Sequence, residues 1–300
     1  MAHNNILVIL IILSIFIFMF TYSQAQKAPA MFIFGDSLVD VGNNNHLKFS
    51  MNEADFSHYG IDFPNKVFTG RFSNGRNAAD FLAEKVGLPT SPPYLSMISN
   101  KSNENFLNGV SFASGGAGIF DDTDKQSCSS ILNSTNLRQF LSKSLFPIVI
   151  GSNDIFAYFQ YVDSMALSIT VQLKRIYDFG ARKFAIVGVG SIGCCPSIRK
   201  DIYTDECNAE INYWCANQKR KKLNSVFGFI EVQTACCGLG HLRAVFPCDL
   251  FSAYCPNRND HDLWDAYHPT EAAAHIIVDN MYHDTSNYSF PMNLRDLLAI

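Results

Sequence analysis

The chain has 300 residues, of which 48% are hydrophobic, and its 23 Lys and Arg against 27 Asp and Glu give a formal net charge of −4. This balance argues against a nucleic-acid partner, because nucleic-acid-binding proteins concentrate basic residues on one face. The one basic cluster, Lys219–Lys222, follows a helical pattern and is predicted to be a solvent-exposed helix face.

The first 25 residues have the pattern of a secretory signal peptide. Residues 6–20 are apolar except for Ser14, and the small-x-small triplet Ser23-Gln24-Ala25 predicts cleavage before Gln26. The alternative is a retained membrane anchor, but this apolar run is shorter than the roughly 20 residues that span a bilayer comfortably. We therefore expect a secreted, extracellular protein with a single domain at 26–300 and no stable membrane insertion after removal of the signal.

Strands and helices are predicted to alternate along the domain. In chain order we expect a strand at 30–34, a helix at 77–86, strands at 110–113 and 145–150, a helix at 162–177, a strand at 183–189 and a helix from Thr270 to about Tyr282. This alternation predicts a parallel sheet with helices on both faces, and the continuously apolar strands agree with burial on both sides. Pro147 lies within 145–150, where a central strand is not expected to lack an amide donor, so the sheet is expected to lack or to remodel an edge strand.

Nine cysteines all follow the signal peptide. They stand at 128, 194, 195, 207, 215, 236, 237, 248 and 255. The adjacent pairs at 194–195 and 236–237 do not have the CxxC spacing of a zinc site, so we expect disulfides and no metal. An odd count leaves at least one thiol unpaired, and Cys215, in a helical stretch, is the candidate. Three N-glycosylation acceptors, Asn100, Asn133 and Asn287, are predicted in Asn-x-Ser/Thr triplets.

Three of the predicted strands end in polar or glycine-rich loops. These loops are Gly35-Asp36-Ser37, Gly115-Gly116 and Gly151-Ser152-Asn153-Asp154. Ligands of an open α/β sheet bind in the crevice beyond the carboxyl ends of its strands, so a hydroxyl, backbone amides and a carboxamide are expected to converge there. By itself, the Gly-Asp-Ser segment is also compatible with an ordinary Asx turn. Asp36 is interpreted as structural, holding the turn of the serine, and Asp154 as an acceptor that stabilises its loop.

The segment Asp265–Thr270 supplies a base immediately before the last predicted helix. The spacing between Asp265 and His268 allows the carboxylate to contact Nδ1 of the imidazole, which leaves Nε2 free to accept the proton of Ser37. A single His before a helix is more often a capping residue, but the nearby carboxylate and the convergent loops favour catalysis.

Four ordered blocks of this sequence resemble the plant secreted GDSL esterase/lipase family of the SGNH hydrolase superfamily. They are Phe34–Asn44, Asn108–Gly118, Gly151–Asp154 and Asp265–Thr270, and the resemblance extends from about Lys27 to the C-terminus. It implies a three-layer α/β/α, flavodoxin-like sandwich. It also implies a Ser37 nucleophile, a His268 general base oriented by Asp265, and an oxyanion hole made by the amides of Ser37 and Gly115 and the side chain of Asn153.

The implied activity is hydrolysis of carboxylic esters, acyl or acetyl, through an acyl-enzyme and without a cofactor. Expected substrates are small-molecule, lipid or polysaccharide esters. Two alternatives remain. The same residues could transfer the acyl group to another alcohol, or the chain could be a truncated, non-catalytic homologue with a binding or structural role. The resemblance also implies that the chain is shorter than its relatives. They place a further strand and helix between the helix with Lys219–Lys222 and the Cys236-Cys237 loop, which Asn224–Ile230 joins almost directly here, and they carry a different small residue at the position of Cys215.

Overall fold

The computed structural model describes residues 26–99, 106–120, 135–202, 204–215, 228–283 and 289–300. The predicted signal peptide, the three glycosylation acceptors Asn100, Asn133 and Asn287, Cys128 and the cluster Lys219–Lys222 lie outside these residues. Among the residues described, no helix is long and apolar enough to cross a membrane.

A parallel sheet of three strands runs through the centre of the described chain, in the order β1 (Phe34–Gly35), β2 (Leu145–Val149) and β3 (Lys183–Val187). Ile148 is paired with Phe34 on one side and with Ile186 on the other. All five residues of β2 are buried, as the apolar run predicts for a strand covered on both faces. The predicted α/β class is therefore confirmed.

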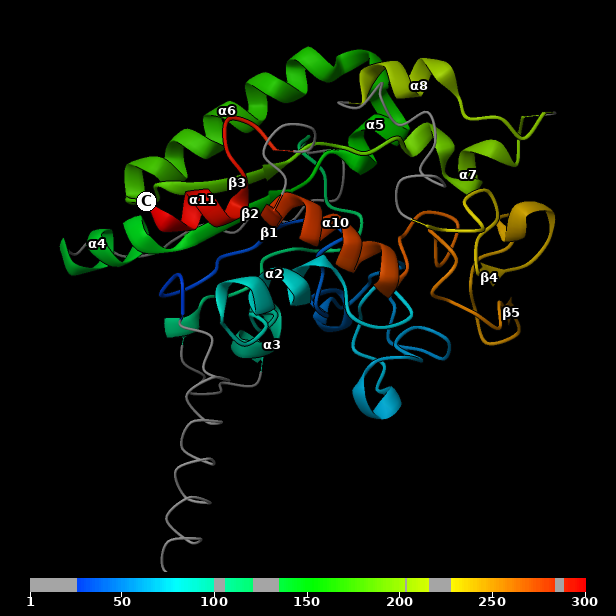
Figure 1. Cartoon of the computed structure of the whole chain (residues 1–300), viewed down its shortest axis with the longest axis horizontal. Coiled ribbons are helices and arrows are strands. Elements are labelled where there is room, and N and C mark those ends of the chain that lie inside the picture. Colours follow the sequence, from blue (N-terminus) through cyan, green and yellow to red (C-terminus); the bar gives the residue numbers. More distant parts are fainter. Residues whose placement is uncertain (1–25, 100–105, 121–134, 203, 216–227, 284–288) are drawn as a thin grey trace, which may run out of the picture.

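Helices surround this sheet (Figure 1). They are α2 (Ala78–Val86), α3 (Tyr94–Ser99), α4 (Thr135–Lys143), α5 (Ser152–Tyr158), α6 (Val162–Phe179), α7 (Pro196–Arg199), α8 (Ala209–Trp214), α10 (Glu271–His283) and α11 (Leu294–Ala299). Short 3-10 helices occur at Asn44–His46, Pro64–Lys66, Phe106–Asn108, Phe159–Tyr161, Ile192–Cys194 and His241–Arg243. The helix predicted at 77–86 is capped by Asn77 and ends at Gly87 in the left-handed region, and Thr270 caps α10 as expected.

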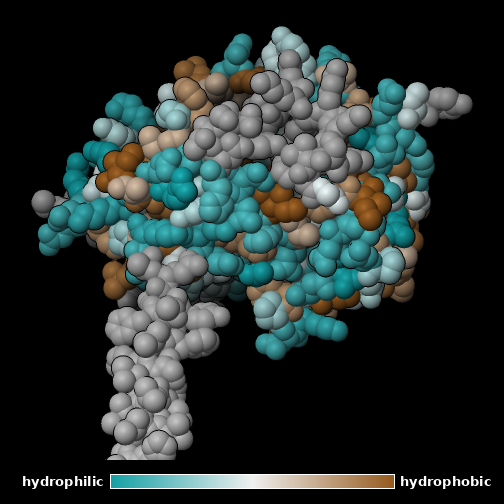
Figure 2. Space-filling model, viewed as in Figure 1, coloured by the Kyte–Doolittle hydropathy of each residue, from teal (hydrophilic) through white to brown (hydrophobic). Residues whose placement is uncertain are grey.

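The main core joins one face of the sheet to α2, α10 and α11. Val149, Leu82 and Val278 are buried together there. A second apolar cluster, which includes Ile155 and Met165, packs α5 and α6 with the segment that follows β3. Figure 1 shows α6 and α5 on the side of the sheet opposite α2 and α10, so the molecule has the three layers that the resemblance implies. On the face drawn in Figure 2, hydrophobic residues form separate patches within a mainly hydrophilic surface, as is usual for a folded domain.

Two predicted strands are shorter than expected. The run 30–34 contributes only Phe34 to β1, and 110–113 contributes Ser111, which forms isolated parallel bridges to Ile33 and to Pro93. Pro147 accounts for the first difference. The amide of Leu145 donates to the carbonyl of Ala30, and the carbonyl of Leu145 accepts from the amide of Phe32. Alternate residues of β2 therefore direct their main-chain groups toward the 30–34 segment. Pro147, two residues after Leu145, is the next of these and has no amide hydrogen to donate. A central strand does contain this proline, and the ladder beside it is interrupted.

β3 forms the open edge of the described sheet. None of the described residues pairs with its outer side, and Ile186 is 56% exposed although it lies in an apolar strand. The expectation that an edge strand is missing therefore agrees with the part of the chain that the structure describes.

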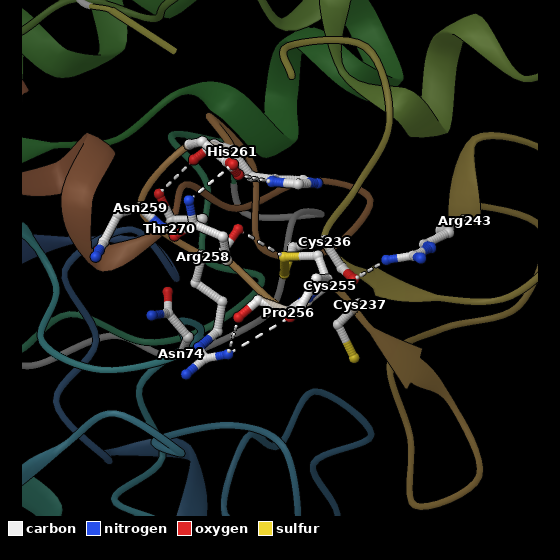
Figure 3. Close-up of a disulfide and its surroundings, with 12 residues drawn as sticks. Asn74, Cys236, Cys237, Arg243, Cys255, Pro256, Arg258, Asn259, His261 and Thr270 are labelled. Atoms are coloured by element: carbon white, nitrogen blue, oxygen red, sulfur yellow. Dashed lines mark hydrogen bonds and ion pairs between the residues drawn. A yellow bond between two sulfur atoms is a disulfide. The ribbon is translucent and has the colours of Figure 1, made fainter. Parts of the chain in front are cut away.

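A disulfide-rich lobe follows α8 and contains the small antiparallel sheet of β4 (Cys237–Gly238) and β5 (Ala253–Tyr254). Its disulfides are Cys236–Cys255 and Cys237–Cys248, and a third, Cys194–Cys207, lies near α7. Figure 3 shows the surroundings of Cys236, whose carbonyl accepts a hydrogen bond from Arg243. Within the described residues Cys195 and Cys215 are free and buried, so the prediction of a free Cys215 holds and Cys195 is a second free thiol.

Candidate active site

Ser37, His268 and Asp265 meet at the carboxyl end of the sheet. Oγ of Ser37 lies 2.8 Å from Nε2 of His268, and Nδ1 of His268 lies 2.8 Å from both carboxylate oxygens of Asp265. The serine is 231 residues from the histidine in sequence, so only the fold can bring them together. A hydroxyl, an imidazole and a carboxylate in this chain of contacts form the geometry of a nucleophile with its base and the group that orients the base.

Asp265 is buried and fully engaged. It accepts hydrogen bonds from the amides of Tyr267 and His268 and, at 2.8 Å, from the hydroxyl of Tyr59. Burial by itself raises the pKa of this carboxyl group, but the charge and hydrogen bond of His268, with the donors Tyr267 and Tyr59, lower it further than burial raises it. Asp265 is therefore ionised at neutral pH and faces the imidazole as a fixed negative charge.

Tyr59 is a part of the site that sequence reasoning missed. Burial and the neighbouring Asp265 raise the pKa of its phenol well above the ordinary value, so its hydroxyl stays protonated and donates. It lies in an irregular loop between two polar segments, with no motif or periodicity to distinguish it from the other tyrosines of the chain. Only the fold reveals that this loop passes beside the carboxylate of Asp265.

Ser37 occupies a tight turn directly after β1. The carboxylate of Asp36 accepts the amide of Leu38 at 3.0 Å, which is the structural role predicted for Asp36. A side chain at Gly35 would collide with the carbonyl of Val149 on β2, so the close approach of the two strands requires glycine there. Burial raises the pKa of Asp36 to about 6, against the lowering effect of the Leu38 amide.

The segment Asp40–Asn43, which follows Ser37, is hydrogen-bonded to the loop at Ser111–Ala113. Asp40 accepts the amides of Gly42 and Asn43, and the side chain of Asn43 donates to the carbonyls of Ser111 and Ala113. Burial raises the pKa of Asp40 to about 6, although these amide donors lower it. The side-chain bonds of Asn43 thus add to the main-chain bonds between these segments, such as those from the amide of Ile33 to Val110 and from the amide of Ser114 to Gly35.

Of the three predicted oxyanion donors, Ser37 and Asn153 line the cavity, and Gly115 is not among its lining residues. The first donor, the main-chain amide of Ser37, belongs to the same residue as the proposed nucleophile. Asn153 lies in the first turn of α5, and its side chain donates one amide hydrogen to the carbonyl of Ala117 at 2.8 Å. The amide of Gly115 donates to Asp40 at 3.0 Å and to Asn44 at 2.9 Å. Gly116, with a positive φ of 87°, lines the cavity beside Ser37. Asp154 accepts the amides of Ile119 and Phe120, as predicted for a loop-stabilising acceptor.

The disulfide-rich lobe fixes the loop that carries the acid and the base. The amides of Cys236 and Cys237 donate to the carbonyls of Leu263 and Trp264, the two residues before Asp265, at 3.0 and 2.6 Å. Disulfides join Cys236 to Cys255, as Figure 3 shows, and Cys237 to Cys248. The position of Asp265 and His268 therefore depends on covalent closure of this lobe.

A cavity of about 1060 Å³ opens beside the triad and is lined by Ser37, His268 and Asn153. Aromatic side chains border it: Phe72 lies 4.9 Å from the ring of His268, and Phe156 packs edge-on against Tyr267. A pocket of this size takes a small organic molecule or a lipid chain.

Comparison with known proteins agrees with this geometry. Residues 31–281 match the family model described as GDSL-like Lipase/Acylhydrolase. The chain belongs to this family. It is 41% identical to GDSL esterase/lipase At5g55050 of Arabidopsis thaliana, with 90% of each chain covered, and 32% identical to GDSL esterase/lipase 7 of the same plant, with 91% of this chain and 93% of the relative covered.

The alignment with At5g55050 also shows how many positions of the relative this family member lacks. It spans 338 positions, whereas 90% of this chain is about 270 residues, so about 68 aligned positions of the relative have no counterpart here. This agrees with the expectation that the chain is shorter than its relatives, and with the open edge of β3.

Proposed function

We propose that this chain is a serine carboxylic-ester hydrolase that acts through an acyl-enzyme on Ser37. The observation that carries the proposal is the continuous contact from Ser37 through His268 to Asp265, with 2.8 Å at each step. Family membership supports hydrolysis of ester substrates as the reaction class, because the family is described as lipases and acylhydrolases.

In the proposed reaction, Oγ of Ser37 attacks the ester carbonyl while Nε2 of His268 takes the hydroxyl proton. The carbonyl C–O bond to the alcohol then breaks, and His268 returns the proton to the leaving oxygen. Water repeats the sequence on the acyl-enzyme and releases the acid. The charge of Asp265 stabilises the imidazolium that forms in each half of the cycle.

The negative oxygen of each intermediate needs donors already aimed at it. We assign this role to the amide of Ser37 and the second amide hydrogen of Asn153. The predicted role of Gly115 stays a prediction: in the free molecule its amide is engaged by Asp40 and Asn44, so it serves the oxyanion only if the turn at Gly115-Gly116 shifts. Gly116, which already lines the cavity, is the adjacent source of a main-chain donor.

We further propose that the protein is secreted after cleavage before Gln26. Three disulfides support an oxidising compartment, because they persist outside the reducing cytosol.

A fluorophosphonate probe tests the proposed function directly, since it reacts covalently with activated serines. We expect labelling of the wild-type domain and of the control Ser142→Ala, whose hydroxyl lies on α4 and bonds only to Gln139. Ser37→Ala and His268→Ala should not be labelled. An unlabelled wild type, or equal labelling of Ser37→Ala, would show that the chain is a non-catalytic homologue or uses another nucleophile. Analysis of products with added alcohols separates hydrolysis from acyl transfer.

A further inference from the structure

The cavity beside the triad does not end at the catalytic residues. From Ser37 and His268 it continues along β3 to the far part of α10 and to α11. Its lining there includes Ala185 and Val187 of β3, Ile277 and Met281 of α10, and Leu294 and Leu297 of α11. α11 contacts both β3 and α10, and residues of all three elements line this part of the cavity, which we call the trough.

This trough is apolar and uncharged. No charged residue lines the cavity from β3, α10, α11 or the position before α11, among the residues that the structure describes. The polar lining residues there are Asn280 and Asn293. Asn280 donates to the carbonyl of Ile276 and Asn293 caps α11, so both have structural partners. An uncharged trough whose one end is a nucleophilic serine suits the hydrocarbon tail of an ester better than a sugar or a charged acid.

The trough is open where the described sheet ends. Ile186 of β3 is 56% exposed, and the outer side of β3 has no partner among the described residues. About 68 positions of the relative At5g55050 have no counterpart in this chain. The trough therefore runs along the open edge strand of the described sheet, in a chain that has fewer residues than this relative.

We propose, resting on the proposed function, that the trough binds the acyl chain and makes this enzyme selective for esters of medium to long fatty acids. Ala274, near the catalytic end of α10, and Met281, near its far end, are seven residues apart, which is about 10 Å along a helix. An extended carbon chain advances roughly 1.25 Å per carbon for bonds of about 1.5 Å. This part of the trough thus holds about eight carbons of an acyl chain. With the carbons that lie between it and Ser37, we expect the highest kcat/KM for acyl chains of about 12 carbons.

The first experiment measures kcat/KM on p-nitrophenyl esters from acetate to palmitate, below their aggregation concentrations. Full burial of one methylene gives up to about a fourfold gain, and in an open trough we expect about twofold for each carbon. From butanoate to dodecanoate the gain should be about 10²-fold, followed by a plateau or decline. A profile that is flat or falls beyond butanoate would overturn the assignment.

Two tryptophan substitutions on α10 test how far along the helix the acyl chain extends. Ile277 and Met281 are four residues apart on the same face of the helix, and Ile277 is nearer to His268. Ile277→Trp should lower kcat/KM for dodecanoate at least tenfold and leave acetate within about twofold. Because four residues span about 6 Å, the cut-off in Met281→Trp should lie about five carbons further out. The control Leu167→Trp, on the exposed side of α6, should match the wild type.

The outcomes separate this inference from the proposed function. Labelling by a short-chain fluorophosphonate at the wild-type rate shows that a variant is folded and its triad intact. If the wild type hydrolyses acetate but both tryptophan variants keep its chain-length profile, the enzyme assignment stands and the acyl trough is wrong. If no ester is hydrolysed and Ser37 is not labelled, both proposals fail.

Discussion

The hydrogen bond from Tyr59 to Asp265 offers a test of how the buried carboxylate supports catalysis. Tyr59→Phe removes one hydroxyl and keeps the ring, which packs against Phe56 and Phe72. Asp265 then loses its only phenolic donor but keeps His268 and two backbone amides. A hydrogen bond to a charged group contributes about 1.5–3 kcal/mol, so the loss is worth roughly a factor of 10 to 100.

We expect kcat/KM of Tyr59→Phe to fall by about that factor on a short-chain ester. The pH profile should change as well. Tyr59 is one of the groups that lower the pKa of Asp265, so its removal raises that pKa, and the carboxylate is protonated at a higher pH than in the wild type. The acid-side loss of activity should therefore move toward neutral pH.

The assay is kcat/KM from pH 4 to pH 9, with melting temperature measured in parallel. Tyr213→Phe is the matched control, because Tyr213 is 63% exposed on α8 and packs against Trp214 instead of the triad. Activity within twofold of the wild type and an unchanged acid limb would refute the reasoning. A fall in melting temperature with an unchanged pH profile would assign Tyr59 a purely structural role.

Three further predictions concern other residues of the fold. Asn153→Ala should lower kcat about 10²- to 10³-fold with KM nearly unchanged, and a raised KM with unchanged kcat would instead assign Asn153 to substrate binding. Asp36→Asn should remove a pH-dependent loss of stability. Burial raises the pKa of Asp36 from 3.8 to about 6, so between these values the folded state binds a proton that the unfolded state has released. The free energy of unfolding of the wild type should therefore fall by roughly 3 kcal/mol between pH 4 and pH 8, and that of Asp36→Asn should not. Parallel melting curves for both proteins across that range would contradict this. Cys195 and Cys215 are buried, and burial raises the pKa of Cys195 to about 12, so both should resist alkylation in the native protein and react only after denaturation; fast native labelling of either would be the opposite result.

The individual sequence blocks could be recognised because the hydrogen bonds within each block are local. The carboxylate of Asp36 bonds to an amide two residues on, and Asp265 bonds to the amides two and three residues on, so residue type and spacing carry the geometry. The helix at 77–86 could be predicted for the same reason, since Asn77 and Gly87 act within one turn of the helix ends. In each case the decisive contact lies within a few residues of the motif.

What sequence reasoning missed depends on contacts over long separations. Tyr59 is 206 residues from its partner Asp265, and no pattern around it marks that contact. The length of β1 depends on Pro147, more than 100 residues away, which removes an amide from the neighbouring strand. The engagement of the Gly115 amide likewise depends on Asp40 and Asn44, whose side chains reach across from another block.

In this shortened member of the family, the candidate site and the open edge of the sheet belong to different strands. Ser37 follows β1 and Asn153 follows β2, and β2 is paired on both sides. Asp265 and His268 are held by the disulfide-stapled lobe through Leu263 and Trp264, not by β3. We therefore expect the open edge to affect the proposed acyl trough and to leave the proposed reacting groups in place. A difference in chain length is expected to alter acyl-chain selectivity first and turnover of the shortest esters least.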